Sequence, residues 1–154
     1  MFEIINTQDK IAIKTEDYKS LLSSARELIP ETEGRSISFV FISDEEMKQL
    51  NEMFRNKPTT TDVLSFPTGL EDFENPDNTM GEVVISVEQA QKQARENKIS
   101  LELEIKQLLL HGVLHLSGYD HETDSGKMNS FELDLRDKLG INKSYRCVLG
   151  GRYF

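Results

Sequence analysis

The sequence predicts an α/β fold of the α+β kind, a single domain in which a small mixed sheet of four strands is packed by about five helices. Three observations lead to this class. Short β-branched and aromatic stretches alternate with stretches whose apolar residues recur at helical spacing. A chain of 154 residues is long enough for one core and too short for two. Cys147 is the only cysteine, so no internal disulfide can hold the fold.

Each element is predicted from its pattern and its boundary residues. Extended segments are expected where β-formers lie between turn signals: residues 2–5, 11–13, 37–42, 63–66 and 82–86. Helices are expected where apolar or strongly helix-forming residues dominate: residues 16–29, 43 to about 54, 87–98, the segment after Ser100, and about 125–139. Ser43 and Glu46 form a capping-box pattern, and Ser100 can cap the next-to-last helix. The acidic, aperiodic residues 68–79 are expected to form a mobile surface loop.

Composition excludes several classes of protein. Hydrophobic residues make up 37% and charged residues 29% of the chain, as in ordinary soluble proteins, and no apolar run approaches the length of a membrane span. The N-terminus lacks a basic segment followed by an apolar stretch, so no secretory signal is expected. We therefore expect no membrane association and a cytoplasmic location.

The charge is unevenly distributed. A net charge of −9 argues against a nucleic-acid partner, because phosphate binding depends on clustered Lys and Arg. The tail from about 141 to 154, however, holds no acidic residue and combines basic with aromatic side chains. These are Lys143, Tyr145, Arg146, Arg152, Tyr153 and Phe154. Two interpretations remain open: the tail contacts RNA by charge and stacking, or it is a strand or loop with a solvated basic face.

All three histidines of the chain, His111, His115 and His121, fall within eleven residues. Histidines four residues apart on a helix project from one face, and Gly118 would let the chain turn back to deliver the third. Three ligands without a fourth from the protein are typical of catalytic zinc, which keeps an open position for water. The spacing therefore predicts one bound zinc ion, and makes three unrelated core or surface histidines improbable.

The same run differs from zinc peptidases in one decisive position. Their pattern is H-E-x-x-H-x-x-G-x-x-H, in which the glutamate is the general base. Gly112 occupies that position here, so peptide hydrolysis by this mechanism is disfavoured. A metal ion can still activate water and polarise a phosphoryl oxygen, which favours phosphodiester hydrolysis. Asp120 is either a partner that orients a ligand imidazole or a turn residue.

Arg55 is the second candidate catalytic residue, beside His111. It is predicted near a helix end, next to a threonine run that leads into a strand. An arginine there could hold a phosphate with two hydrogen bonds. Considered in isolation, an arginine at that position is more often a partner of the helix dipole.

Together the two segments resemble the bacterial YbeY family. Residues 111–121 are similar to its signature H-G-x-L-H-L-x-G-Y-D-H, and residues 51–67 to its segment N-x-x-[YF]-R-x-K-x-x-P-T-D-V-L-S-F-P. Residues 80–86 resemble its Gly-acidic strand, and the resemblance covers roughly residues 1–140. One departure is that Lys57 is followed directly by Pro58.

The resemblance implies a metal-dependent endoribonuclease that prefers single strands and acts in ribosomal RNA maturation, chiefly near the 3′ end of the small-subunit RNA, and in ribosome quality control. It implies zinc on His111, His115 and His121, and a role of Arg55 in activity. It also implies RNA, the small ribosomal subunit and assembly factors such as an Era-type GTPase as partners. Two alternatives remain: a zinc-dependent peptidase-like or small-substrate hydrolase, and a non-catalytic ribosome-assembly module with a structural metal.

Overall fold

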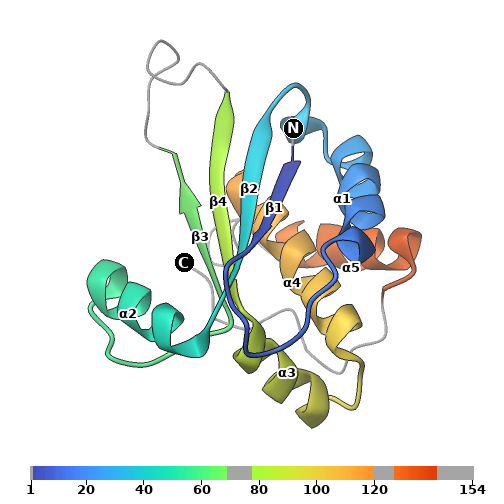
Figure 1. Ribbon diagram of the computed structural model, residues 1–154. Helices are drawn as coiled ribbons and strands as arrows, with labels where there is room; N and C mark the ends of the chain where they lie inside the picture. Colours follow the sequence, from blue (N-terminus) through green and yellow to red (C-terminus); the bar gives the residue numbers. More distant parts are fainter. Residues whose placement is uncertain (1, 69–77, 120–126, 142–154) are drawn as a thin grey trace.

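The computed structural model describes residues 2–68, 78–119 and 127–141 (Figure 1). Its described part contains four strands and five α-helices, which confirms the predicted α+β class. The strands are β1 (Phe2–Asn6), β2 (Ser36–Ile42), β3 (Val63–Pro67) and β4 (Thr79–Ser86). The helices are α1 (Glu16–Leu28), α2 (Asp44–Arg55), α3 (Val87–Glu96), α4 (Leu101–Leu116) and α5 (Lys127–Leu139), with a 3-10 turn, η1 (Pro30–Thr32), after α1.

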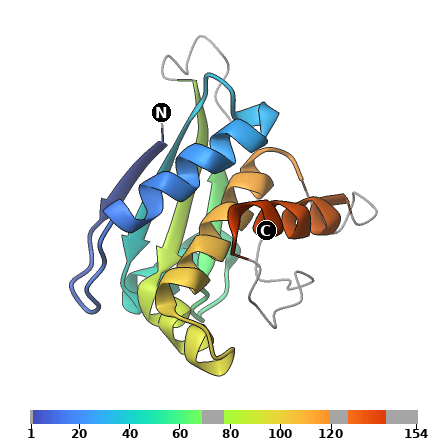
Figure 2. The ribbon, with the colours of Figure 1, turned by 90° about the vertical axis from the view of Figure 1, so that its right-hand side faces the viewer.

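The sheet is mixed, with the strand order β1-β2-β4-β3. β1, β2 and β4 run parallel, and β3 pairs antiparallel with β4 at the edge. Helices α1, α4 and α5 cover one face of this sheet, and α2 lies on the other (Figures 1 and 2). The sheet therefore has an inner face, against α4, and an outer face that α2 covers only in part.

The alternation of side chains along β2 explains these two layers. Ile37, Phe39 and Phe41 point to the inner face and are buried in the main core with α1 and α4. Ile42 and Val40 belong instead to a smaller cluster with α2, on the outer face. Because α4 is covered by the sheet and by neighbouring helices, it is buried along nearly its whole length, as the sequence predicts.

Serine residues cap the N-termini of α2 and α4, the two helices that carry candidate site residues. Ser100 Oγ accepts a hydrogen bond from Leu103 N at 3.0 Å at the start of α4, and Ser43 Oγ accepts one from Glu46 N at 3.3 Å at the start of α2. Both caps confirm the sequence prediction. α2 ends at Arg55, and the left-handed backbone conformation of the next residue, Asn56 (φ +58°), turns the chain toward β3.

Three predictions differ from the structure by more than one residue. Residues 11–13 form no strand, because the Gln8 side chain accepts from the Lys10 and Ile11 backbone N–H groups and closes a local turn. β4 begins at Thr79, three residues before the predicted strand, because its first residues pair with β2. α3 ends at Glu96, two residues earlier than predicted.

Other predictions fall outside the described residues. These are the loop at residues 69–77, the start of the last helix at about residue 125, and the tail from residue 142. In the part of the chain that the structure describes, no helix has both the length and the apolar character needed to cross a bilayer.

Candidate metal centre

Helix α4 carries two of the three predicted ligands. His111 is completely buried, and His115, one turn further along the same side of the helix, is half-buried near the C-terminal end. His121 and Asp120 lie outside the described residues. Among the residues that the structure describes, no group of three His, Cys, Asp or Glu side chains is placed so that it could hold a metal ion. The complete triad therefore stays a prediction.

A buried acidic side chain fixes the orientation of His111. His111 Nδ1 lies 2.5 Å from Glu132 Oε1 on α5, and Arg136 donates from Nη2 to Glu132 Oε2 at 2.6 Å. Burial raises the pKa of the Glu132 carboxyl, but the hydrogen bond and charge of His111 and the nearby Arg136 outweigh it, so the pKa lies below its ordinary value. Glu132 is thus a carboxylate that accepts a hydrogen bond from the Nδ1–H group of His111.

This arrangement suits a metal ligand. A neutral imidazole that carries its proton on Nδ1 presents the lone pair of Nε2. Metal-bound histidines usually donate their other ring N–H to a carboxylate, carbonyl or water, which fixes the tautomer and raises the basicity of the ligand nitrogen. The donor set that the described residues provide therefore fits a metal held through His111 Nε2.

Gly112 is required by the packing of α4 on the sheet. A Cβ atom at this position would lie 2.6 Å from Val83 Cγ1 and 2.8 Å from Val83 Cγ2, both closer than real contacts allow. Zinc peptidases carry their glutamate at this position. Here the close contact between α4 and β4 leaves no room for a side chain at residue 112. This observation strengthens the sequence argument against a peptidase of that class.

The turn after α4 is also held in place. Gly118 has φ +99°, and the backbone N–H of Tyr119 bonds to Leu114 O at 3.1 Å, which ends the helix. Tyr119 Oη donates to Glu31 Oε2 of η1 at 2.7 Å, and its ring packs against Phe131 of α5. Desolvation and the Glu31 carboxylate raise the pKa of Tyr119 to about 12, so the hydroxyl stays protonated. The segment that leads to His121 thus starts from a fixed point.

Arg55 is the last residue of α2 and is half-buried. The following loop is tied back to the helix, because Asn51 Nδ2 donates to Thr59 O at 2.7 Å. Helix α2 packs against α3 and β4 from the outer face, whereas α4 packs on the inner face. Helix packing thus does not bring Arg55 beside His111, and its catalytic role stays a prediction.

Sequence reasoning missed Glu132 and Arg136. A signal existed: Glu132, Leu135 and Arg136 are spaced i, i+3 and i+4, so they share one side of a helix. A charged residue on an apolar face indicates a buried partner, but the sequence does not say which one.

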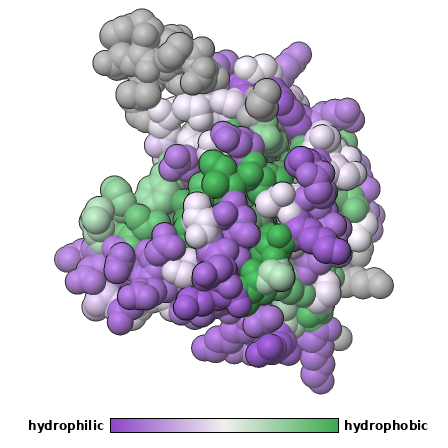
Figure 3. Space-filling view, in the orientation of Figure 1, coloured by the Kyte–Doolittle hydropathy of each residue, from purple (hydrophilic) through white to green (hydrophobic). Residues whose placement is uncertain are grey.

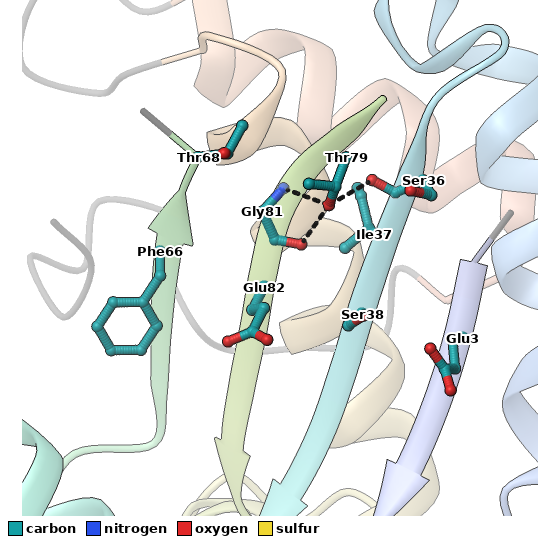
Figure 4. Close-up of a pocket in the computed structure, with 9 residues that line it drawn as sticks. All are labelled: Glu3, Ser36, Ile37, Ser38, Phe66, Thr68, Thr79, Gly81 and Glu82. Carbon is teal, nitrogen blue, oxygen red and sulfur yellow. Dashed lines mark hydrogen bonds between the residues drawn. The ribbon is translucent and has the colours of Figure 1, made fainter. Parts of the chain in front are cut away.

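A cavity of about 640 Å³ opens on the outer face of the sheet (Figure 4). Glu3, Ser38, Glu82 and Phe66 cross its floor as register partners on β1, β2, β4 and β3. The cavity lies on the face away from α4, and its two carboxylates disfavour a phosphate ligand. We therefore place the candidate site at α4 and not in this cavity.

Comparison with known proteins decides the family. Residues 3–140 match the family described as Endoribonuclease YbeY. The chain belongs to this family. The match confirms the resemblance derived from residues 51–67 and 111–121, and its extent agrees with the expected residues 1–140.

Individual relatives agree. The chain is 42% identical over 128 residues to "Endoribonuclease YbeY" of Nautilia profundicola, covering 83% of this chain and 89% of that protein. It is 40% identical over 142 residues to the protein of the same name from Onion yellows phytoplasma, covering 90% and 96%. The solution structure of TM1509 from Thermotoga maritima has a TM-score of 0.60 and 26% identity, covering 92% of this chain and 93% of that one.

Proposed function

We propose that this protein is a metal-dependent endoribonuclease that cuts single-stranded RNA in ribosomal RNA maturation, at the 3′ end of the small-subunit RNA, and in ribosome quality control. Membership of the endoribonuclease YbeY family supports the reaction class. The observation that carries the proposal is the buried contact between His111 Nδ1 and Glu132, which prepares Nε2 of a helical histidine as a metal ligand.

The cofactor in this proposal is one zinc ion held by His111, His115 and His121. When bound there, such an ion lowers the pKa of a coordinated water and polarises a phosphoryl oxygen. The histidine and oxygen donors of this chain suit zinc, and a site without cysteine ligands suits a catalytic more than a structural ion.

The other groups act around these ligands. Glu132 holds the proton of His111 on Nδ1, and Arg136 keeps the carboxylate charged. In the proposal Arg55 holds a phosphate of the substrate. Gly112 supplies no base, so protein groups would not deprotonate the water from that position.

A role in ribosomal RNA maturation also determines the partners and the location that we propose. The partners would be single-stranded ribosomal RNA, the small ribosomal subunit and an Era-type GTPase, in the cytoplasm where subunits are assembled. The family resemblance supports these partners, and the basic-aromatic tail supports contact with RNA.

The test separates metal binding from phosphate binding. We expect His115→Ala and His121→Ala to lose bound zinc and cleavage together, measured by metal analysis and by cleavage of a labelled single-stranded RNA. Arg55→Ala should keep its zinc but lose at least tenfold in cleavage rate. Arg95, an exposed arginine in the last turn of α3, provides the matched control Arg95→Ala, which should cleave normally.

Contaminating ribonuclease is excluded in the same experiment, because the His115→Ala protein, purified identically, must show only background cleavage. If Arg55→Ala cut RNA at the rate of Arg95→Ala, the assigned role of Arg55 would be wrong. If His115→Ala kept full activity, the proposed metal chemistry would be wrong.

A further inference from the structure

An exposed aromatic side chain stands at the C-terminal end of α2. Phe54 is 59% exposed, although large hydrophobic side chains are normally buried. Its ring meets Phe66 of β3 edge to face, with 5.1 Å between the ring centroids. Hydrophobic surface gathers over the left-hand end of α2 and the neighbouring edge of the sheet (Figure 3). Phe66 therefore supports the Phe54 ring from one side and leaves much of that ring open to solvent.

The backbone around this ring is well defined. α2 ends at Arg55, Asn56 adopts the left-handed conformation, and Lys57 N bonds back to Asn51 O at 3.3 Å. The side chain of the buried Asn51 also donates to Thr59 O at 2.7 Å. A ring on a helix end that is fixed in this way loses little freedom when a ligand stacks on it.

Two positively charged residues follow the ring in the chain. Arg55 follows Phe54 directly, and Lys57 is exposed two residues later. Glu52 is also exposed, so residues 52–57 carry one carboxylate against these two cations. Glu82 lies opposite Phe66 in the sheet, so the acidic cavity borders Phe66, whereas the two cations follow Phe54 in the chain. An aromatic face with flanking cations is the composition that binds single-stranded nucleic acid.

We propose that Phe54, braced by Phe66, is a stacking platform for one base of single-stranded RNA, with Arg55 and Lys57 at the adjacent phosphates. The inference rests on the proposed function and deepens it by assigning a substrate-binding surface outside the histidine run. β3 is the edge strand of the sheet, and its inner face packs against α4. An RNA strand that passes round this edge can reach from the platform toward the helix that carries His111.

Fluorescence of 2-aminopurine tests the platform, because stacking on an aromatic ring quenches it. The probe is a short, uridine-rich oligoribonucleotide with one 2-aminopurine and 2′-O-methyl riboses, so that it binds without being cut. The full-length protein should quench the probe. Phe54→Leu keeps an apolar side chain but removes the aromatic face, so we expect quenching to be lost and the Kd to rise about tenfold.

Three further variants control this result. Phe54→Tyr keeps the ring and should restore both quenching and affinity. Met53→Leu changes the neighbouring side chain, which is 73% exposed, and should match the unmodified protein. Lys57→Gln should weaken binding at low salt while quenching at saturation persists. Because Lys57 is exposed, this variant tests the surface even where Phe54→Leu fails to fold.

The possible outcomes are distinct. Unchanged quenching and affinity in Phe54→Leu, or unchanged affinity in Lys57→Gln, overturns the platform and leaves the exposed ring as a surface for a protein partner. Cleavage of unmodified RNA is measured separately with zinc. A protein that quenches through Phe54 but cuts no RNA refutes the proposed nuclease function and supports the platform. A protein that binds no RNA overturns both.

Discussion

At the scale of single residues, the close packing of Gly112 against Val83 predicts how much an alanine at this position would destabilise the protein. An alanine there places a methyl group 2.6 Å from one Val83 methyl and 2.8 Å from the other, and rotation of this stiff side chain does not relieve both contacts. Overpacking lowers the free energy of unfolding by about 1–3 kcal/mol, whereas the better helix propensity of alanine relative to glycine raises it by about 1 kcal/mol. We expect Gly112→Ala to lower the free energy of unfolding by about 1 kcal/mol, measured by urea denaturation.

A second substitution identifies the cause. Val83→Ala creates space opposite residue 112, so the double variant should lose less stability than the sum of the two single variants, with a coupling of about 1 kcal/mol. Additive losses, or a Gly112→Ala protein as stable as the unmodified one, would contradict the packing explanation.

The residues of the site differ in how far they could be predicted. His111 and His115 were identifiable because a metal ligand set has a characteristic spacing within one helix. Gly112 was noticed for its chemistry, whereas its contact with Val83 depends on a strand 29 residues earlier in the chain. Glu132 was missed because its partner His111 is 21 residues away, on another helix, and no local pattern records that pairing.

At the scale of elements, the Asp44 carboxylate joins three segments by hydrogen bonds, and its loss should destabilise the protein. Its Oδ1 accepts hydrogen bonds from Thr60 Oγ1 and, at 3.0 Å, from Ser86 Oγ, and its Oδ2 accepts one from Gln89 Nε2 at 3.2 Å. The start of α2, the loop before β3 and the start of α3 therefore share one carboxylate. We expect Asp44→Ala to lower the free energy of unfolding by about 2 kcal/mol, since hydrogen bonds to charged groups contribute about 1.5–3 kcal/mol each when buried and less when half-exposed.

The neighbouring exposed Glu45 provides the matched control, because it lies in the same first turn of α2. Both variants lose one favourable charge at the helix N-terminus, so any difference between them measures the shared hydrogen bonds. Urea denaturation of Glu45→Ala and Asp44→Ala should differ by more than 1 kcal/mol. Equal losses would mean that Asp44 acts only on the helix dipole.

The elements themselves were predictable where local chemistry decides them. Ser43 and Ser100 mark helix starts because their hydroxyls accept from backbone N–H groups three residues later. Residues 11–13 were wrongly predicted to be extended because the side chain of Gln8, outside that stretch, closes the turn. The early start of β4 depends on pairing with β2, which its own residues do not encode.

At the scale of the whole molecule, charge separates the domain from its tail. The residues after Ile141 add three positive charges to a chain whose net charge is −9, so the remainder carries −12. A phosphate-binding enzyme of that charge needs local cations. Ile141 itself is buried, and Gln107 Nε2 donates to its carbonyl at 2.6 Å, one helical turn before His111 on α4. The tail thus departs from a point fixed on the helix that carries the candidate ligands.

Salt dependence tests whether this tail contacts RNA. For single strands the slope of log K against log salt is about −0.7 for each phosphate neutralised. Deleting residues 142–154 retains Ile141 and removes three cations, so we expect the slope to become shallower by about 2 and binding to weaken most at low salt. A full-length variant with Lys143, Arg146 and Arg152 changed to Gln keeps Tyr145, Tyr153 and Phe154, and separates charge from stacking. If both variants kept the slope of the unmodified protein, the tail would be a solvated basic segment, and Arg55 and Lys57 would have to account for the attraction of RNA.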